Sequence, residues 1–372
     1  MRKKIKVMFA FGTRPEAIKM IPIIKKMNDD DRFITRILVT AQHREMLDQV
    51  LDTFEIHPDY DLNIMVEKQN LVHITNTVLE KVSYILEQES PNILLVHGDT
   101  TTTYASALAA FYKNITIGHV EAGLRTGKKY SPFPEEMNRQ LTDVLTDIYF
   151  APTEQSKKNL LLENHKEENI IVTGNTAIDM MKYTIKNNYV SKTVKIFEKD
   201  QKIILLTMHR RENIGKPMEN VFKAIRKIAS LHSEVKIVFP MHKNPVIRQL
   251  AKKVLGSSDN IYLVEPLSVE DFHNLCSRSY MVLTDSGGIQ EEAPSFGVPV
   301  LVLRDTTERP EGVDAGTLKL IGTEELGVLK EIETLLIDEG EHKKMTKIKN
   351  PYGDGFASEK ILEGIINYFS SL

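Results

Sequence analysis

The sequence predicts an α/β protein made of two Rossmann-like, doubly wound parallel-sheet domains. Short apolar runs alternate with amphipathic segments along the chain, and the alternation starts again after Gly174-Asn175-Thr176. Strands that alternate with helices are typical of parallel sheets covered by helices on both faces. The length of 372 residues also exceeds what one hydrophobic core commonly supports, which favours two domains.

Six apolar runs in the first half have the composition of strands buried on both faces. They are residues 5–11, 34–40, 93–97, 115–120, 148–151 and 170–173. Helical periodicity between them predicts helices at residues 15–28, 42–54, 71–89, 102–112 and 136–146. The second half repeats the pattern, with strands at residues 203–208, 235–239, 261–264, 280–284, 300–303 and 317–321.

We expect a first domain at residues 1–173 and a second at residues 177–350. We expect the last segment, residues 357–372, to form a helix that packs back on the first domain. Open α/β sheets bind ligands at the carboxyl ends of their strands. The two sets of strand-end loops are therefore expected to face a central cleft.

Composition narrows the functional class. The hydrophobic share of 41% and the charged share of 27% are those of an ordinary globular protein. A net charge of -3 gives no basic field for nucleic acid. The single cysteine, Cys276, excludes a disulfide framework and favours a reducing compartment. No apolar run reaches the length of about 18 residues of a membrane span, and residues 7–11 are too short for a signal peptide, so we expect a cytoplasmic protein.

Three carboxylates follow predicted strands in the first half. Asp99 lies in His97-Gly98-Asp99-Thr100, Glu121 in His119-Val120-Glu121-Ala122-Gly123, and Glu135 in Pro132-Phe133-Pro134-Glu135. Positioned carboxylates are candidate acid/base groups. Asp99 alone could instead cap the helix after it. The pairs His97-x-Asp99 and His119-x-Glu121 also suggest metal ligands, but no Cys-rich or His-x-x-x-His spacing supports a metal site.

The second half offers an anion site in Asp285-Ser286-Gly287-Gly288, where a predicted strand ends and a helix begins. Free backbone N–H groups and glycines let a phosphate approach closely at such a place. The alternative is plain helix capping by Ser286 or Asp285.

Cationic groups follow the first strand of each half. Arg14 and Lys19 lie one turn apart after Phe11-Gly12-Thr13, with Pro15 suited to the first helical position. His209 lies beside Arg210 and Arg211, where an imidazole can donate to a phosphate. Ordinary solvated cations and a loop held by Arg–Glu pairs are the respective alternatives.

Together these stretches resemble the non-hydrolysing UDP-N-acetylglucosamine 2-epimerases. The matching motifs occur in order at residues 11–20, 96–100, 119–127, 132–139, 209–213, 285–293 and 304–311. The resemblance implies the GT-B arrangement of two Rossmann-like domains around a cleft. It also implies interconversion of UDP-GlcNAc and UDP-ManNAc through loss and readdition of UDP, a supply of ManNAc units for bacterial surface polysaccharides, no cofactor or metal, and a homodimer.

The resemblance also implies roles for single residues. Asp99, Glu121 and Glu135 match acid/base positions, and His209 matches a catalytic histidine near the diphosphate. The positions that match contacts to UDP are Arg14, Lys19, Phe272, Ser286, Gly287, Gly288 and Glu292. A second, activating UDP-GlcNAc would contact Gln42, His43, Arg210 and His242. Glu45 and Lys68 depart from that activator pattern, where Gln and Arg are expected.

Three other functions stay open. A hydrolysing epimerase that releases free ManNAc, or a GT-B glycosyltransferase, would use the same fold. A UDP-sugar-binding regulator without turnover would keep the phosphate site and lose the acids, and here all three acids are present. A dinucleotide-dependent reductase is disfavoured because Phe11-Gly12-Thr13-Arg14 lacks the G-x-G-x-x-G fingerprint.

Overall fold

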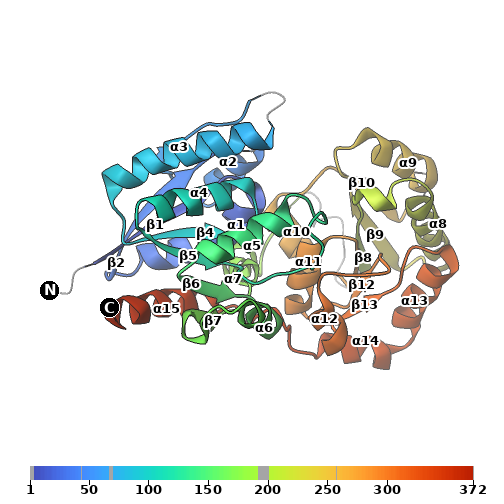
Figure 1. The fold of residues 1–372 in the computed structure, drawn as a ribbon. Helices are drawn as coiled ribbons and strands as arrows, with labels where there is room; N and C mark the ends of the chain where they lie inside the picture. Colours follow the sequence, from blue (N-terminus) through green and yellow to red (C-terminus); the bar gives the residue numbers. More distant parts are fainter. Residues whose placement is uncertain (1–3, 43, 67–69, 192–200, 257, 372) are drawn as a thin grey trace. The chain divides into compact units, whose positions relative to one another are not determined.

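The computed structural model describes residues 4–42, 44–66, 70–191, 201–256 and 258–371. The chain forms two compact units. Unit 1 comprises residues 1–180 and 353–372, and unit 2 comprises residues 181–352. Each contains one parallel sheet, labelled in Figure 1, so the prediction of two doubly wound parallel sheets is confirmed.

Unit 1 contains a seven-stranded sheet in the order β3-β2-β1-β4-β5-β6-β7. Its strands are β1 (Ile5–Phe11), β2 (Phe33–Val39), β3 (Tyr60–Asp61), β4 (Ile93–His97), β5 (Thr116–Val120), β6 (Ile148–Ala151) and β7 (Ile170–Val172). The chain moves outward from β1 to β3 and then returns to β4 on the other side of β1. The strand order thus reverses between β1 and β4, which is where doubly wound sheets bind their ligands.

Helices cover both faces of this sheet. They are α1 (Arg14–Asn28), α2 (Arg44–Thr53), α3 (Leu71–Glu89), α4 (Thr101–Tyr112), α5 (Glu135–Leu145), α6 (Glu154–Leu162) and α15 (Ala357–Ser371). Helix α4 lies between α3 and α5, and α1 contacts α2 and α15. Met8 and Ala10 of β1 belong to the core under α3 and α4, while Phe9 and Phe11, which alternate with them, are also fully buried. Burial on both faces explains the unbroken apolar run of β1.

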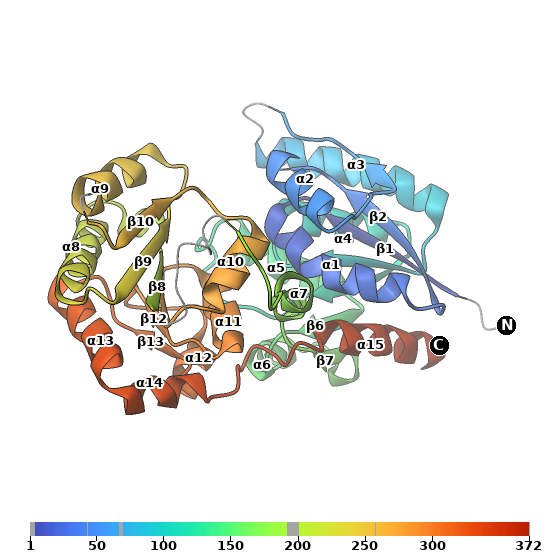
Figure 2. The ribbon, with the colours of Figure 1, turned by 180° about the vertical axis from the view of Figure 1, so that it is seen from behind.

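The carboxyl-terminal helix α15 belongs to unit 1. It packs against α1, β6 and β7, as can be followed in Figure 2. A side chain at Gly364 would place its Cβ 2.4 Å from the Cδ1 atom of Ile171. Only glycine lets the helix approach the sheet this closely at that position.

Unit 2 contains a six-stranded sheet in the order β10-β9-β8-β11-β12-β13. Its strands are β8 (Lys202–Thr207), β9 (Val235–Pro240), β10 (Ile261–Val264), β11 (Met281–Thr284), β12 (Val300–Val302) and β13 (Leu318–Leu320). The order reverses between β8 and β11. The loops after these two strands carry the motifs around His209 and Ser286.

The helices of unit 2 are α8 (Lys216–Leu231), α9 (Pro245–Leu255), α10 (Val269–Cys276), α11 (Gly287–Glu292), α12 (Pro310–Ala315), α13 (Glu325–Ile337) and α14 (Glu339–Thr346). Helix α7 (Thr176–Thr184) carries the chain from unit 1 into unit 2. A core between the sheet and α8, α9 and α13 includes Phe222 and Phe239, whose rings meet edge to face at 5.3 Å. Cys276 is buried at the end of α10, and burial raises the pKa of its thiol.

No helix among the described residues is both long enough and apolar enough to cross a membrane.

Candidate active site

Asp99 follows β4 and is held by α5. Arg139 Nη2 donates to Asp99 Oδ2 at 2.5 Å, and Asn138 Nδ2 donates to the Asp99 carbonyl oxygen at 3.0 Å. The N-cap of α4 is Thr100, whose side chain accepts from the Thr103 N–H. Asp99 therefore does not cap this helix, and the structural alternative considered for it is wrong. Its carboxylate is oriented by an arginine and remains partly exposed.

Glu121 follows β5 with a left-handed backbone, φ 68°. Its Oε2 atom accepts from Lys19 Nζ and, at 2.9 Å, from Asn175 Nδ2. The Glu121 and Lys19 side chains are 10% and 13% exposed. The two opposite charges therefore pair where little water reaches them. Lys19, which the family pattern assigns to UDP, thus lies beside an acid/base candidate.

A buried histidine, His97, lies next to Glu121. Its Nε2 atom is 3.9 Å from Glu121 Oε2, and neither ring nitrogen has a hydrogen-bond partner among the residues that the structure describes. Burial lowers the pKa of His97 to about 3, so the ring is neutral. The sequence suggested His97 only as a motif residue and as a possible metal ligand beside Asp99. Its position directly before Gly98-Asp99 at a strand end was the available signal.

Glu135 is the first residue of α5 and is half-buried. No other residue that the structure describes forms an ion pair with it. The next residue, Glu136, is fully buried and accepts from the backbone N–H groups of Thr126 and Gly127. Glu136 therefore ties the loop after β5 to the start of α5, where Glu135 lies.

Arg14 begins α1, and a capping box sets the start of this helix. Glu16 accepts from the Gly12 and Thr13 N–H groups at 3.0 and 2.8 Å. It also accepts from the Thr100 hydroxyl at 2.7 Å, which links α1 to the loop after β4. Burial raises the pKa of Glu16, although these hydrogen bonds act in the opposite direction. The spacing Thr13-x-x-Glu16 is a capping signal that sequence reasoning missed.

Gly12 is required at the end of β1. A Cβ atom there would lie 2.0 Å from the Thr40 hydroxyl oxygen, so any larger residue would force that hydroxyl to move. Thr40 Oγ1 is itself 2.9 Å from Thr102 Oγ1, which donates to Gln42 Oε1 at 3.0 Å. This polar packing fixes the backbone that leads into Arg14.

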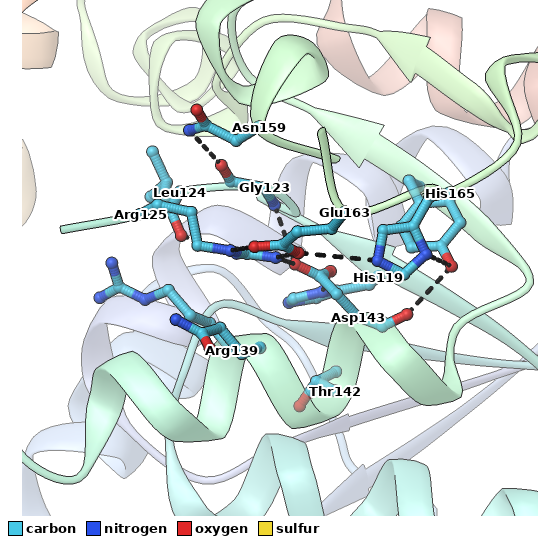
Figure 3. Close-up of polar contacts among 12 residues, drawn as sticks. His119, Gly123, Leu124, Arg125, Arg139, Thr142, Asp143, Asn159, Glu163 and His165 are labelled. Atoms are coloured by element: carbon cyan, nitrogen blue, oxygen red, sulfur yellow. Dashed lines mark hydrogen bonds and ion pairs between the residues drawn. The ribbon is translucent and has the colours of Figure 1, made fainter. Parts of the chain in front are cut away.

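Behind the loop after β5 lies a buried ionic network, shown in Figure 3. His119 Nδ1 is 2.6 Å from Asp143 Oδ1, and Arg125 Nη2 donates to Asp143 Oδ2 at 2.6 Å. Arg125 also forms a two-bond ion pair with Glu163 through Nε and Nη2, at 2.7 and 2.6 Å. His119 and Asp143 are fully buried. Because both nitrogens of His119 have protein partners, the suggestion of a metal ligand at this residue is not supported.

In unit 2 the central group is Asp285, which is fully buried. Its carboxylate accepts from the backbone N–H groups of His209 and Arg210 at 3.0 and 2.9 Å, and from Asn213 Nδ2 at 3.0 Å. Asp285 therefore anchors the loop after β8 to the end of β11. Its side chain is engaged there rather than at the start of α11.

Ser286, Gly287 and Gly288 lie at the start of α11, where Ser286 is the N-cap residue without a side-chain capping bond. Ser286 is thus the N-cap residue, as the capping alternative allowed, but its side chain forms no capping hydrogen bond, and Asp285 does not occupy the cap position. Helix α11 has only six residues, so its dipole is short. A Cβ at Gly287 would lie 3.4 Å from the Arg309 guanidinium carbon. An arginine thus borders this glycine turn, and sequence reasoning did not single it out.

Glu292 and Phe272 lie on either side of His273. Glu292 Oε2 is 3.3 Å from His273 Nε2, while His273 Nδ1 is 2.8 Å from the Thr184 hydroxyl. The Phe272 ring meets the His273 ring edge to face at 6.3 Å. The buried histidine therefore links the two residues that the family pattern assigns to the nucleoside.

The remaining predicted positions are distributed over both units. The His209 and His242 rings stack at 5.8 Å, and burial together with the charge of His209 lowers the pKa of His242. Arg210 Nη1 lies 3.4 Å from Glu308. Burial opposes ionisation of Glu308, but Arg304 and Arg210 outweigh it and lower its pKa to about 2. His43 and Lys68 lie outside the described residues.

Within the described part of the chain, no group of three or more His, Cys, Asp or Glu side chains could hold a metal ion.

Comparison with known proteins identifies the family. The family model described as UDP-N-acetylglucosamine 2-epimerase matches residues 25–366. The UDP-N-acetylglucosamine 2-epimerase of Bacillus subtilis is 57% identical over 370 residues, which cover 99% of this chain and 96% of that protein. The chain belongs to the UDP-N-acetylglucosamine 2-epimerase family. The prediction of this family and of an enzyme is confirmed.

Solved epimerase structures share the fold at full length. The S. aureus MnaA–UDP co-structure has a TM-score of 0.89 and 56% identity and covers 99% of this chain and 97% of that one. The UDP-GlcNAc 2-epimerase of Neisseria meningitidis bound to UDP-GlcNAc has a TM-score of 0.89 and 47% identity, with coverages of 98% and 100%. A glycosyltransferase of Rickettsia africae matches at a TM-score of 0.61 with 14% identity, covering 97% of each chain. The predicted GT-B-like fold class is therefore confirmed.

Proposed function

We propose that this epimerase-family chain interconverts UDP-GlcNAc and UDP-ManNAc by inversion at C2 without releasing free sugar. The observation that carries this proposal is the set of acids at strand ends of unit 1. Two of them are oriented by cations, Asp99 by Arg139 and Glu121 by Lys19. Family membership and the UDP-GlcNAc and UDP bound by relatives of known structure support the substrate.

The chemistry that these groups must perform can be written out. No carbonyl lies next to C2, so its proton is not acidic enough for simple abstraction. A carboxylate takes the C2 proton while the C1–O bond breaks and UDP leaves with the bonding electrons, giving 2-acetamidoglucal. UDP then adds back to C1 while a carboxylic acid protonates C2 on the other face. Proton transfer by a positioned group typically contributes about 10²- to 10⁴-fold.

We assign Asp99, Glu121 and Glu135 to these proton transfers, with the choice of face for each left open. The pairing of Glu121 with Lys19 favours a carboxylate that starts as a base. His97 lies against the same carboxylate as a neutral ring. A neutral ring with two unpartnered nitrogens can accept or donate a hydrogen bond when Glu121 changes its charge.

We assign UDP to residues of unit 2 and to the start of α1. Ser286, Gly287 and Gly288 would offer backbone N–H groups to the diphosphate, with His209 donating beside them. Glu292 suits the ribose hydroxyls and Phe272 the uracil ring. Arg14 would add a charged hydrogen bond to the phosphates.

A second UDP-GlcNAc acting as activator would contact Gln42, His43, Arg210 and His242. The described members already have partners, Thr102 for Gln42 and Asp285 for Arg210. Of the two departures from the activator pattern, Glu45 in place of Gln adds a negative charge, whereas Lys68 in place of Arg keeps the positive charge. Rate measurements test whether UDP-GlcNAc is an activator. If it is, the forward rate should depend sigmoidally on the UDP-GlcNAc concentration, and the reverse reaction of UDP-ManNAc should be faster when UDP-GlcNAc is supplied than when it is withheld.

Proton NMR of UDP-GlcNAc with the enzyme in D₂O tests the proposed reaction. We expect deuterium at C2, formation of UDP-ManNAc and little free sugar. Free ManNAc as the main product would establish the hydrolysing reaction instead, and sugar transfer to an added acceptor would establish a glycosyltransferase. An unchanged substrate that nevertheless binds would indicate a regulator.

Replacing Arg14 with alanine is expected to weaken UDP binding by roughly 1.5 to 3 kcal/mol, the contribution of a hydrogen bond between charged groups. Folding should be unaffected, because the capping box of Glu16 remains. Calorimetric titration with UDP measures the change. Arg32→Ala is the matched control, since Arg32 lies at the amino end of β2 and pairs with Asp30 and Glu363. Equal affinity in the wild type and Arg14→Ala would remove Arg14 from the UDP site.

A further inference from the structure

His119 connects the two loops that carry Asp99 and Glu121. Its Nε2 atom is 2.7 Å from the Gly98 carbonyl oxygen, directly before Asp99 in the chain. The Gly98 N–H in turn donates to the Val120 carbonyl oxygen at 3.0 Å, directly before Glu121. The side chain and the backbone thus join the ends of β4 and β5 by two hydrogen bonds, in opposite directions.

The partners of His119 determine what its ring must donate. A carbonyl oxygen can only accept, so Nε2 carries a hydrogen. The partner of Nδ1 is the Asp143 carboxylate, at 2.6 Å. Burial raises the pKa of Asp143, but His119 and Arg125 outweigh it and bring that pKa below its ordinary value. Since Asp143 is then an acceptor as well, the ring donates through both nitrogens.

The charges around this ring balance. Asp143 lies between His119 and Arg125, and Arg125 is shared with Glu163. Glu163 lies 3.7 Å from His165 Nε2 at the far end of the network. Outside this network, Glu121 pairs with Lys19 and lies 3.9 Å from the uncharged His97. A buried cation paired and hydrogen-bonded in this way is stable, whereas removal of one partner leaves the other charge uncompensated.

The same network also reaches the loop after Glu121. Gly123 N–H donates to Asp143 Oδ2 at 3.2 Å, and Gly123 has φ 84°. A Cβ at Gly123 would lie 2.4 Å from the Ser156 carbonyl oxygen, so the loop packs tightly against α6. Asp143 therefore holds the residues that follow Glu121, while His119 holds the residue that precedes Asp99.

We propose that His119, oriented by Asp143 and Arg125, is a positioning residue that sets the separation of the Asp99 and Glu121 carboxylates for proton transfer at the two faces of one carbon atom. It touches neither substrate nor the reacting proton. The proposal rests on the proposed epimerase function, because only a reaction that uses both carboxylates on one centre requires their separation to be constant. Misplacement of a catalytic group by about 1 Å can cost about 10²-fold in rate.

Two substitutions separate the two hydrogen bonds of the ring. The amide nitrogen of glutamine reaches the place of Nε2 and keeps a donor for Gly98, while that of asparagine reaches only the place of Nδ1. We expect His119→Asn to lower kcat by about 10²-fold. His119→Gln should keep most of the wild-type kcat. Both should leave KM and the affinity for UDP unchanged. His165→Gln is the control, because His165 belongs to the same network and bonds Tyr149 rather than Gly98; its kcat per folded molecule should equal that of the wild type.

The outcomes distinguish failure of this inference from failure of the proposed function. Absence of C2 exchange in the wild type would refute the function itself. Exchange by the wild type together with equal kcat for His119→Asn, or equal losses for His119→Asn and His119→Gln, would overturn the positioning role. Nitrogen NMR of the wild type labelled with ¹⁵N-histidine needs no variant: we expect a ring with hydrogens on both nitrogens coupled to Gly98 and Asp143. A ring with one N–H at this place would refute the arrangement.

Discussion

Replacing Asp99, Glu121 or Glu135 with its amide is expected to lower turnover by about two to four orders of magnitude while UDP affinity stays unchanged. Each amide keeps the shape of the side chain and removes the group that transfers a proton, a loss of about that size. A negative carboxylate also cannot hold a diphosphate, so binding should not suffer. Initial rates of epimerisation, deuterium exchange at C2 and calorimetric titration with UDP measure these quantities on the same samples.

His209→Asn provides the contrasting case. If the imidazole donates to the phosphate as UDP leaves, this variant loses both UDP affinity and rate. Glu135→Gln should also keep its melting temperature, whereas Glu121→Gln and Asp99→Asn lose a charge beside Lys19 and Arg139, respectively. Near-normal exchange in all three amide variants would refute the carboxylate assignment, whatever happens to His209→Asn.

Replacing Asp285 with alanine is expected to destabilise unit 2 by about 3 kcal/mol or more. The substitution leaves the N–H groups of His209 and Arg210 and the amide of Asn213 without their buried acceptor. Each unsatisfied buried donor costs about 1 to 3 kcal/mol. Because the loop after β8 then loses its anchor, UDP affinity should fall with stability. Thermal unfolding and amide hydrogen exchange of residues 202–215 are the measurements.

Asp259→Ala is the matched control for Asp285→Ala. Asp259 is exposed in the loop between α9 and β10, where surface substitutions usually stay within about 0.5 kcal/mol. Asp285→Asn should lie between the wild type and alanine, since one acceptor oxygen remains. A melting temperature for Asp285→Ala equal to that of Asp259→Ala would show that the three donors find other partners.

Local patterns predicted most of the secondary structure. The strand at residues 5–11 and the helix at residues 71–89 have the predicted bounds, because their periodicity and capping signals lie within the segment itself. Among the described residues, the two-residue strand β3 and the helices α6 and α7 were not predicted, and no bounds were predicted for the helices of unit 2. Strand β3 exists only through pairing with β2, and no residue pattern inside two residues can indicate that.

The candidate site could be predicted as positions but not as contacts. Each motif at a strand end follows from the chain order, since a strand ends where its apolar run ends. The pairing of Lys19 with Glu121 joins residues 102 positions apart, and Asp285 accepts from Arg210 75 positions away. The sequence indicated neither the contact of Lys19 with Glu121 nor that of Asp285 with the loop after β8, because both join residues far apart in the chain.

The sequence by itself determined the fold class, the family and the set of acids, cations and glycine turns, because periodicity and motif spacing are properties of neighbouring residues. Only the tertiary structure decided which strands lie beside each other and which charges meet. His119 shows the difference: its motif named it beside Glu121, but its function depends on Gly98 and Asp143, 21 and 24 positions away. Such partners are selected by sheet order and by the need to satisfy every buried polar group, and both are set only when the whole unit has folded.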